Sequence, residues 1–385
     1  MRSNLNRLLP LAAVCLGLFS AGLYLDASHA HLRPPARPSA DLRQALTAIT
    51  PDALRGDLSF LSSDALSGRY TPSAGLDVAA DFIASRFRAS GLEAPVHDTY
   101  FQNADLTEYL KAEPGKHTIR TDQPVQCKNV IGILRGSDPV LRDTYIIVSA
   151  HYDHIGTLKT AAGLTSAKPA SDHDEIYNGA NDDGSGTVSV IAIAQAFANL
   201  RVRPKRSLIF MTFCGEELGL LGSRYYAEHP VVPLKQTIGN INLEQVGRSD
   251  GDIKKGSASL TGFDFTSLGA LFERAGESYG IRVYQDKRSD KYFRASDNYS
   301  FAKYGVPDNT LCAAFEFPDY HGLKDEWPKI DYSQMAQIDK LTAAVVWELA
   351  NSKTAPSWNA NNQKTKPFRD AAAVTYGGAS ILAAR

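Results

Sequence analysis

Short apolar runs recur along the middle of this chain and alternate with stretches of helical spacing. Four of these runs predict buried strands, at residues 145–148, 207–213, 238–243 and 311–317. Helical stretches lie before, between and after them, at residues 187–200, 218–228, 263–279 and 333–351. Strands that alternate with helices predict an α/β fold, in which a central sheet is covered by helices on both faces.

The first thirty residues, 1–30, have the pattern of an export signal. Arg2 and Arg7 precede an apolar run at 8–25, and small residues around Ala30 follow it. An uncleaved membrane anchor is the alternative, because the run is nearly long enough to span a bilayer. We expect a cleaved signal, no membrane span in the mature chain, and a periplasmic or secreted protein.

The remaining sequence divides into three parts by composition. Residues 31–50 predict a linker, and residues 353–385 predict a loosely ordered tail rich in Asn, Lys, Thr and Pro. Residues 51–352 predict one domain, with a helical lead-in at 51–122. After signal cleavage an odd number of cysteines is left, so at least one thiol stays free. Cys214 and Cys312 lie in apolar runs, which is typical of small buried side chains.

The charge balance argues against a nucleic-acid-binding protein. The chain has 41 Lys plus Arg and 42 Asp plus Glu, a formal net charge of −1. Proteins that bind nucleic acid by releasing counterions usually carry an excess of basic residues. We therefore expect no nucleic-acid partner.

Histidine and carboxylate side chains follow the predicted strands. They are His151, Asp153 and His154 after the first strand, Glu216 and Glu217 after the second, Glu244 after the third, and His321 after the fourth. An acidic loop at 178–186 adds Asp182 and Asp183. The carboxyl ends of parallel strands meet at one edge of a sheet, and imidazole nitrogen with carboxylate oxygen suits Zn²⁺.

Each of these residues also has an ordinary structural explanation. Asp182 and Asp183 could form a turn that caps the next helix, and Glu216 and Glu217 could be the acidic first turn of a helix. If these residues had only structural roles, all of these explanations would have to hold at once, and each of them at a strand end. No His-Glu-x-x-His or Walker phosphate-loop motif is present.

Together the motifs resemble the two-zinc aminopeptidases of the aminopeptidase S and aminopeptidase Y type, whose relatives include glutamate carboxypeptidase and the glutaminyl cyclases. The resemblance covers residues 52–351 and rests on His151-Tyr152-Asp153, 178–186, 215–223, Asn242-Leu243-Glu244, Ser296-Asp297 and Tyr320-His321. Residues 57–69 also resemble the lead-in of the bacterial members. The resemblance implies a three-layer zinc-exopeptidase fold with a mixed, mostly parallel sheet.

The resemblance also implies a role for each matching residue. Two zinc ions would be bridged by Asp182, with Glu217 and His321 completing one site and His151 and Glu244 the other. Glu216 would be the general base, Asp153 would orient His151, and Tyr320 would support the oxyanion. Glu244 departs from the family, because many members have Asp there. His154 and His173 match no ligand, and we expect them to be solvated or to support the ligands.

The function implied is metal-assisted hydrolysis of the amino-terminal peptide bond of peptides with a free amino terminus. A glutaminyl cyclase with a single zinc ion is the alternative enzyme, and ligand identity does not separate an aminopeptidase from a carboxypeptidase or dipeptidase. A binding ectodomain without catalysis would have broken ligands, whereas the expected ligands are present apart from the conservative Glu244. The sequence predicts neither the preferred side chain nor the oligomeric state.

Overall fold

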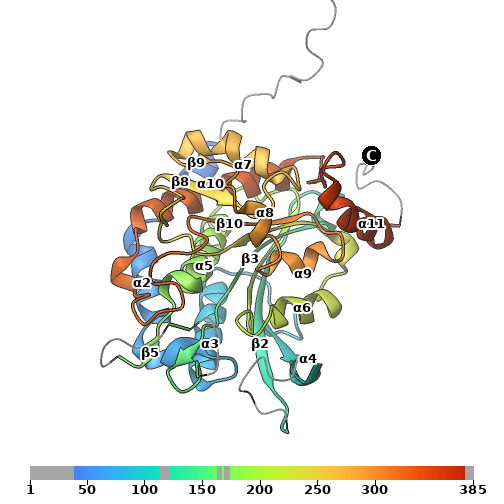
Figure 1. Cartoon of the computed structure of the whole chain (residues 1–385). Helices are drawn as coiled ribbons and strands as arrows, with labels where there is room; N and C mark the ends of the chain where they lie inside the picture. The colour runs from blue at the N-terminus through green and yellow to red at the C-terminus, as the bar shows by residue number, and fades with distance from the viewer. Residues whose placement is uncertain (1–38, 113–118, 120–121, 163–166, 169–173, 378–385) are drawn as a thin grey trace, which may run out of the picture. The chain divides into compact units, whose positions relative to one another are not determined.

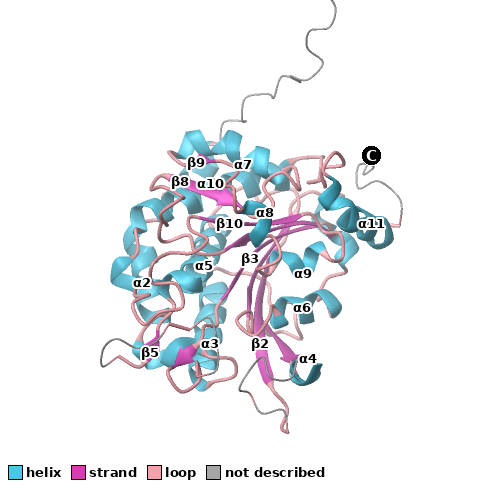
Figure 2. Ribbon diagram, in the orientation of Figure 1, coloured by secondary structure: helices cyan, strands magenta, loops and turns pink. Residues whose placement is uncertain are grey.

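A central eight-stranded sheet organises the protein (Figures 1 and 2). The computed structural model describes residues 39–377 apart from 113–118, 120–121, 163–166 and 169–173, so the predicted signal at 1–30 and His173 lie outside the described residues. The sheet strands are β1 (Phe101–Asp105), β2 (Gln126–Leu134), β3 (Tyr145–His151), β6 (Ser207–Phe213), β7 (Thr237–Leu243), β8 (Ser257–Leu260), β9 (Arg282–Val283) and β10 (Asp308–Cys312). A separate pair joins β4 (Gly156–Thr157) to β5 (Ile176–Tyr177).

The sheet is mixed, with a parallel centre. Its strand order is β1-β2-β6-β3-β7-β10-β8-β9. The central strands β6, β3, β7 and β10 run parallel to one another, whereas the pairs β1–β2, β2–β6 and β8–β10 are antiparallel. The carboxyl ends of the four central strands therefore lie at one edge, as the sequence predicts.

Helices cover both faces of the sheet. Their bounds are α1 (Ala40–Leu46), α2 (Pro51–Leu61), α3 (Ala74–Ala89), α4 (Thr107–Ala112), α5 (Gly186–Ala198), α6 (Leu221–Glu228), α7 (Leu268–Gly276), α8 (Ser289–Tyr292), α9 (Asn298–Ala302), α10 (Tyr332–Asn351) and α11 (Lys366–Thr375). Figure 1 shows α2, α3 and α5 on one side of the sheet and α6 and α9 on the other. The predicted α/β fold with two covered faces is confirmed.

Both faces of the central strands are apolar because each faces its own core. In β3, Ile146 and Val148 pack into the larger core beneath α2, α3, α5 and α10. The alternate residues Tyr145 and Ile147 pack into the core beneath α6 and α9. Successive side chains of a strand point to opposite faces, so a strand covered on both sides needs an unbroken apolar run.

The two ends of the described chain are more ordered than the sequence suggests. Residues 40–46 of the predicted linker form α1, which Ser39 caps and which buries Leu42 and Leu46 in the larger core. The predicted loose tail includes α11, where Phe368 stacks on Trp358. The Trp358 ring nitrogen donates a hydrogen bond to the carbonyl oxygen of Gly305. Both predictions were wrong for these residues, because a few buried side chains hold segments that are polar in overall composition.

Two further boundaries differ from the predicted ones. The lead-in at 51–122 contains α2, α3 and α4 but also the edge strand β1, so it is not helical throughout. The strand predicted at 311–317 is β10, which ends at Cys312. The apolar residues after Cys312 are buried in the loop that continues towards His321.

A disulfide bond joins Cys127 to Cys214. Cys127 lies in β2, and Cys214 directly follows the antiparallel strand β6. Cys214 is buried, as the sequence predicts, and strand pairing brings it together with a cysteine that is far away in the sequence. Cys312 is a free, buried thiol.

Candidate metal centre

The predicted ligands meet at the edge where the central strands end. His151 is the last residue of β3, and Glu244 directly follows β7, its neighbour in the sheet. Glu217 lies just beyond β6 on the other side of β3. Asp182 comes from the turn before α5, and His321 from the loop after β10.

These side chains form two groups that share Asp182. One group contains His151, Asp182 and Glu244. The other contains His154, Asp182, Glu217 and His321, and in each group the ligand atoms lie within 4.8 Å of one another. Two metal sites bridged by one carboxylate would place their ligands in this arrangement.

The distances support a shared position for Asp182. Its Oδ1 lies 3.4 Å from Nε2 of His151, and its Oδ2 lies 3.1 Å from Nε2 of His321. The same His321 nitrogen is 3.2 Å from Oε2 of Glu217. The two carboxylate oxygens of Asp182 therefore face different groups.

Several atoms of the site are buried without a hydrogen-bond partner among the described residues. They include Nε2 of His151, Oδ2 of Asp182, Oε1 of Glu217 and both ring nitrogens of His154. Polar atoms in protein interiors almost always have a partner, so these atoms require another explanation. A cation held by imidazole and carboxylate supplies one, and this donor set fits zinc.

Opposite charges within the site shift the pKa values of its members. Burial alone would lower the pKa of His321, but Glu217 and Asp182 outweigh it and raise the value to about 10. Burial alone would raise the pKa of Glu217, but the charge of His321 outweighs it and lowers the value to about 2. Zinc needs a neutral imidazole, so metal binding at these residues would release a proton from His321.

Glu216 lies beside the group that contains His151. Its Oε2 is 3.9 Å from Nε2 of His151. Burial raises the pKa of Glu216 well above its ordinary value, and the nearby carboxylates of Glu217 and Glu244 raise it further, against the charge of His151. A carboxylate with a raised pKa is a stronger proton acceptor, which suits a general base.

Asp153 fixes the backbone of Glu216 more directly than it fixes His151. Its Oδ1 accepts a hydrogen bond of 3.1 Å from the backbone N–H of Glu216, and its Oδ2 accepts one of 3.2 Å from the hydroxyl of Thr71. The same Oδ1 lies 3.6 Å from Nδ1 of His151, which instead contacts the backbone carbonyl of Asp153 at 3.2 Å. The backbone of Asp153 thus has the orienting position that the sequence assigned to its side chain.

The turn that carries Asp182 is held by two buried carboxylates, Asp325, which sequence reasoning missed, and Asp183, for which the sequence indicated no such role. Asp325 accepts hydrogen bonds of 3.0 Å from the backbone N–H groups of Asn181 and Asp182. Asp183 accepts bonds from the backbone N–H groups of His151 and Gln245. Asp183 was visible in the motif, but nothing around Asp325 in the sequence distinguishes it from a surface acid.

Arg69 is a third residue of the site whose role the sequence did not reveal. It is fully buried, and its guanidinium donates hydrogen bonds to backbone carbonyls of residues far away in the chain. The acceptors are Tyr152 at 2.7 Å, Leu61 at 2.8 Å, Asn178 at 2.7 Å and Gly179 at 2.8 Å. The sequence feature that points to Arg69 is the end of the lead-in motif, Gly68-Arg69. This segment folds against the two loops that carry potential metal ligands.

The structure excludes one of the two positions expected for His154, the solvated one. It is fully buried, so it is not solvated, and its Nδ1 lies 2.8 Å from Oε1 of Glu217. The ring of His321 meets the ring of His154 edge-on, with centroids 5.5 Å apart. His154 therefore belongs to the cluster of potential ligands.

Tyr320 lies against the second group of ligands. Its ring stacks on that of His321, with centroids 4.0 Å apart. Burial raises the pKa of the Tyr320 hydroxyl, and the charges of Asp182 and Glu217 raise it further. The hydroxyl therefore stays protonated and is available as a hydrogen-bond donor.

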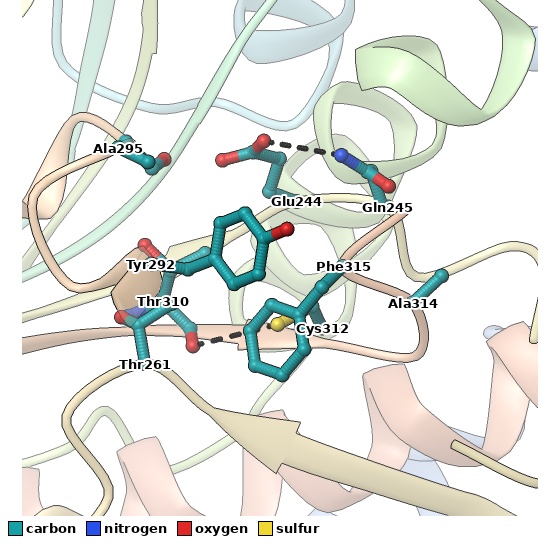
Figure 3. Close-up of a pocket in the computed structure, with 10 residues that line it drawn as sticks. Glu244, Gln245, Thr261, Tyr292, Ala295, Thr310, Cys312, Ala314 and Phe315 are labelled. Carbon is teal, nitrogen blue, oxygen red and sulfur yellow. Dashed lines mark hydrogen bonds between the residues drawn. The ribbon is translucent and has the colours of Figure 1, made fainter. Parts of the chain in front are cut away.

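A pocket adjoins Glu244 (Figure 3). Tyr292 and Phe315 form an aromatic wall, with nearly parallel rings whose centroids are 4.9 Å apart. The rest of the lining is small or polar, with Gln245, Thr261, Ala295, Ser296, Thr310, Cys312 and Ala314. The empty space is about 260 Å³ including its open mouth. This is below the roughly 300–1,000 Å³ of most ligand pockets, so the pocket suits one side chain.

Comparisons with known proteins agree with this geometry. The model of "Peptidase family M28" matches residues 129–346. A probable zinc metalloprotease of Pyrenophora teres f. teres (strain 0-1) is 25% identical over 345 residues, which cover 83% of this chain and 69% of that protein. The LapA aminopeptidase of Legionella pneumophila has a TM-score of 0.58 and 20% identity, over 81% of this chain and 75% of its own. The glutaminyl cyclase of Porphyromonas gingivalis has a TM-score of 0.57 and 16% identity, over 78% of this chain and 98% of its own. The two solved structures share the fold with this chain.

Proposed function

Because the chain belongs to peptidase family M28, we propose that it is a zinc-dependent aminopeptidase, which hydrolyses the first peptide bond of peptides with a free amino terminus. One observation carries the proposal. Two groups of potential ligands share Asp182, with Glu216 beside one of them and the pocket next to Glu244. A metal centre, a general base and a side-chain pocket would then lie next to each other.

The zinc ligands that we propose follow the two groups. His151, Asp182 and Glu244 would hold one ion, and Asp182, Glu217 and His321 the other. When bound, zinc lowers the pKa of water and polarises the carbonyl of the scissile bond. The residues of the chain then have to position the substrate and move the protons.

Glu216 is the proposed carrier of the proton. Its carboxylate accepts a proton from the attacking water as the new C–O bond forms. It then donates that proton to the leaving nitrogen as the C–N bond breaks, so the reaction consumes one water and regenerates Glu216. Tyr320, whose hydroxyl stays protonated, would donate a hydrogen bond to the oxygen on which negative charge develops.

The pocket beside Glu244 supports an exopeptidase that acts at the amino terminus. An amino-terminal residue with its side chain in the pocket would bring its charged amine close to the Glu244 carboxylate. Phe315 and Tyr292 favour an apolar side chain there. The small volume of the pocket favours a single residue over an extended peptide.

The test combines metal analysis with peptide cleavage. We expect about two zinc ions per chain and release of the first amino acid from unblocked peptides, but no cleavage of amino-acetylated ones. Glu216→Gln should lower kcat by about 10³-fold and leave the zinc content unchanged. The matched control is Glu273→Gln, since Glu273 is exposed on α7. Wild-type turnover of the Glu216 variant would refute its assigned role.

The same peptides separate the alternatives. Release of ammonia from amino-terminal Gln, with one zinc ion and no cleavage, would identify a glutaminyl cyclase. Cleavage at the carboxyl end, or of dipeptides only, would identify a carboxypeptidase or a dipeptidase. A folded protein that binds no metal and cleaves no peptide would be a binding domain.

We also propose that the protein is exported, to the periplasm or beyond the cell. The signal pattern at 1–30 supports this proposal, and so does the disulfide bond between Cys127 and Cys214, since such bonds persist in oxidising compartments. Within the described residues, no helix is both long and apolar enough to cross a membrane. Amino-terminal sequencing of protein from a secreting host should find a start after Ala30, whereas an intact Met1 would contradict cleavage.

A further inference from the structure

The imidazole of His154 lies where one more zinc ligand would lie. His154 follows β3, and its Nδ1 is 2.8 Å from Oε1 of Glu217 and 4.0 Å from Oδ2 of Asp182. His321 approaches the same two carboxylates from another side, at 3.1 and 3.2 Å. The four side chains therefore surround one position.

His154 and Glu217 are in close contact through Nδ1 and Oε1. Neither Nδ1 of His154 nor Oε1 of Glu217 has a hydrogen-bond partner among the described residues, although the two atoms are near each other. Two ligands of one ion point at the ion rather than at each other. Around a tetrahedral zinc with ligands at about 2.1 Å, neighbouring donor atoms are about 3.4 Å apart. The observed separations of 2.8 to 4.0 Å lie on both sides of that value.

The backbone around His154 keeps its ring in this position. Gly179 has a positive φ of 55°, and a Cβ atom there would lie 2.4 Å from Cγ of His154. The backbone N–H of His154 also donates a hydrogen bond to the carbonyl of Arg69. The ring is therefore packed against bare backbone on one side and faces the carboxylates on the other.

We propose that His154 is the fourth protein ligand of the zinc site formed by Asp182, Glu217 and His321. The two sites are then unequal. The site with His154 is closed by four protein ligands, as in structural zinc sites, while the site with His151, Asp182 and Glu244 keeps an open position for water. The open site is the one beside Glu216 and the pocket. This inference rests on the zinc binding of the proposed function but not on its peptidase activity.

Zinc K-edge EXAFS of the wild-type protein loaded with two zinc ions tests the proposal directly, because it counts imidazole ligands. We expect three imidazoles shared between two ions, from His151, His154 and His321. A count of two imidazoles would overturn the proposal even in an active aminopeptidase. A count of three in a protein that cleaves no peptide would leave the proposal standing and refute the peptidase activity instead.

A variant pair adds an affinity measurement. His154→Phe keeps a flat ring against Gly179 but removes both nitrogens, and His229→Phe is the control because His229 is exposed and belongs to neither ligand group. In competition with a chelator, His154→Phe should lose more than about 100-fold in affinity for one of the two ions, which exceeds the effect of a supporting hydrogen bond. Zinc affinities within about threefold of wild type would overturn the proposal. Circular dichroism identifies a variant that fails to fold, in which case the EXAFS result decides.

Discussion

Arg69 connects the segments that carry the proposed zinc ligands, so its replacement tests how the site is held together. Its guanidinium binds the carbonyl of Tyr152, next to His151, and the carbonyls of Asn178 and Gly179 in the loop before Asp182. Burial lowers the pKa of Arg69 to about 10, against the charges of the surrounding aspartates. The group therefore remains charged at neutral pH. Arg69→Met would keep most of the volume and remove every donor.

The expected loss of stability follows from the carbonyls left behind. Of the four acceptors, Gly179 keeps a second donor in the N–H of Gly184. The other three, in Tyr152, Leu61 and Asn178, lose the guanidinium. A buried polar group without its partner costs about 1–3 kcal/mol, so Arg69→Met should lower the free energy of unfolding by about 3–9 kcal/mol. That is a large share of the roughly 5–15 kcal/mol that stabilises a typical protein.

Urea unfolding followed by circular dichroism measures this loss. The control is Arg135→Met, because Arg135 pairs with Glu93 at the surface, where such a pair contributes less than about 1 kcal/mol. Arg69→Lys keeps the charge but not the forked geometry, so its stability should lie between that of Arg69→Met and wild type. A loss below about 1 kcal/mol for Arg69→Met, no larger than that of the control, would refute the reasoning.

Three further predictions address other parts of the molecule. Burial raises the pKa of Asp339 to about 8, so between about pH 5 and about pH 8 the folded protein keeps a proton that the unfolded chain loses. The free energy of unfolding should therefore fall as pH rises. In urea unfolding, wild type should lose about 3–4 kcal/mol relative to Asp339→Asn across that range. The same pH dependence of unfolding in both proteins would show that the carboxyl is not buried. Replacing both Cys127 and Cys214 by Ser should lower the free energy of unfolding by about 4–5 kcal/mol, since the bond spans 87 residues, and the double variant should be insensitive to reductants that destabilise wild type. Phe315→Ala should enlarge the pocket and shift kcat/KM towards bulkier amino-terminal side chains by about 10-fold relative to Ala; an unchanged ratio in a panel of dipeptide substrates would show that the side chain binds elsewhere.

The parts of the fold that the sequence predicted best are those with a strong local pattern. β6 matches the predicted run at 207–213, and α10 begins one residue before the predicted helix at 333–351, because unbroken apolar runs and helical periodicity are local signals. His151, Glu217 and Glu244 could be brought together in advance, because parallel strands end at the same edge. No sheet geometry has to be known in detail for that inference.

The residues that were missed depend on contacts between distant segments. Arg69 reads as a charged residue in a loop until its carbonyl partners, in segments far along the chain, are known. The direction of the His154 ring depends on Gly179, which lies in another loop. The pairing of Cys127 with Cys214 needed the antiparallel register of β2 and β6. None of these contacts leaves a periodic trace in the sequence.

The packing of α11 has a consequence for anyone who shortens this chain. The region recognisable as a peptidase, 129–346, stops inside α10, whereas the packed helices reach from α1 to α11. A fragment cut at the recognisable boundary would divide one helix and lose Trp358 and Phe368, which pack against Phe265 and Phe293. The borders by which such a domain is recognised are therefore narrower than the borders of its packed core.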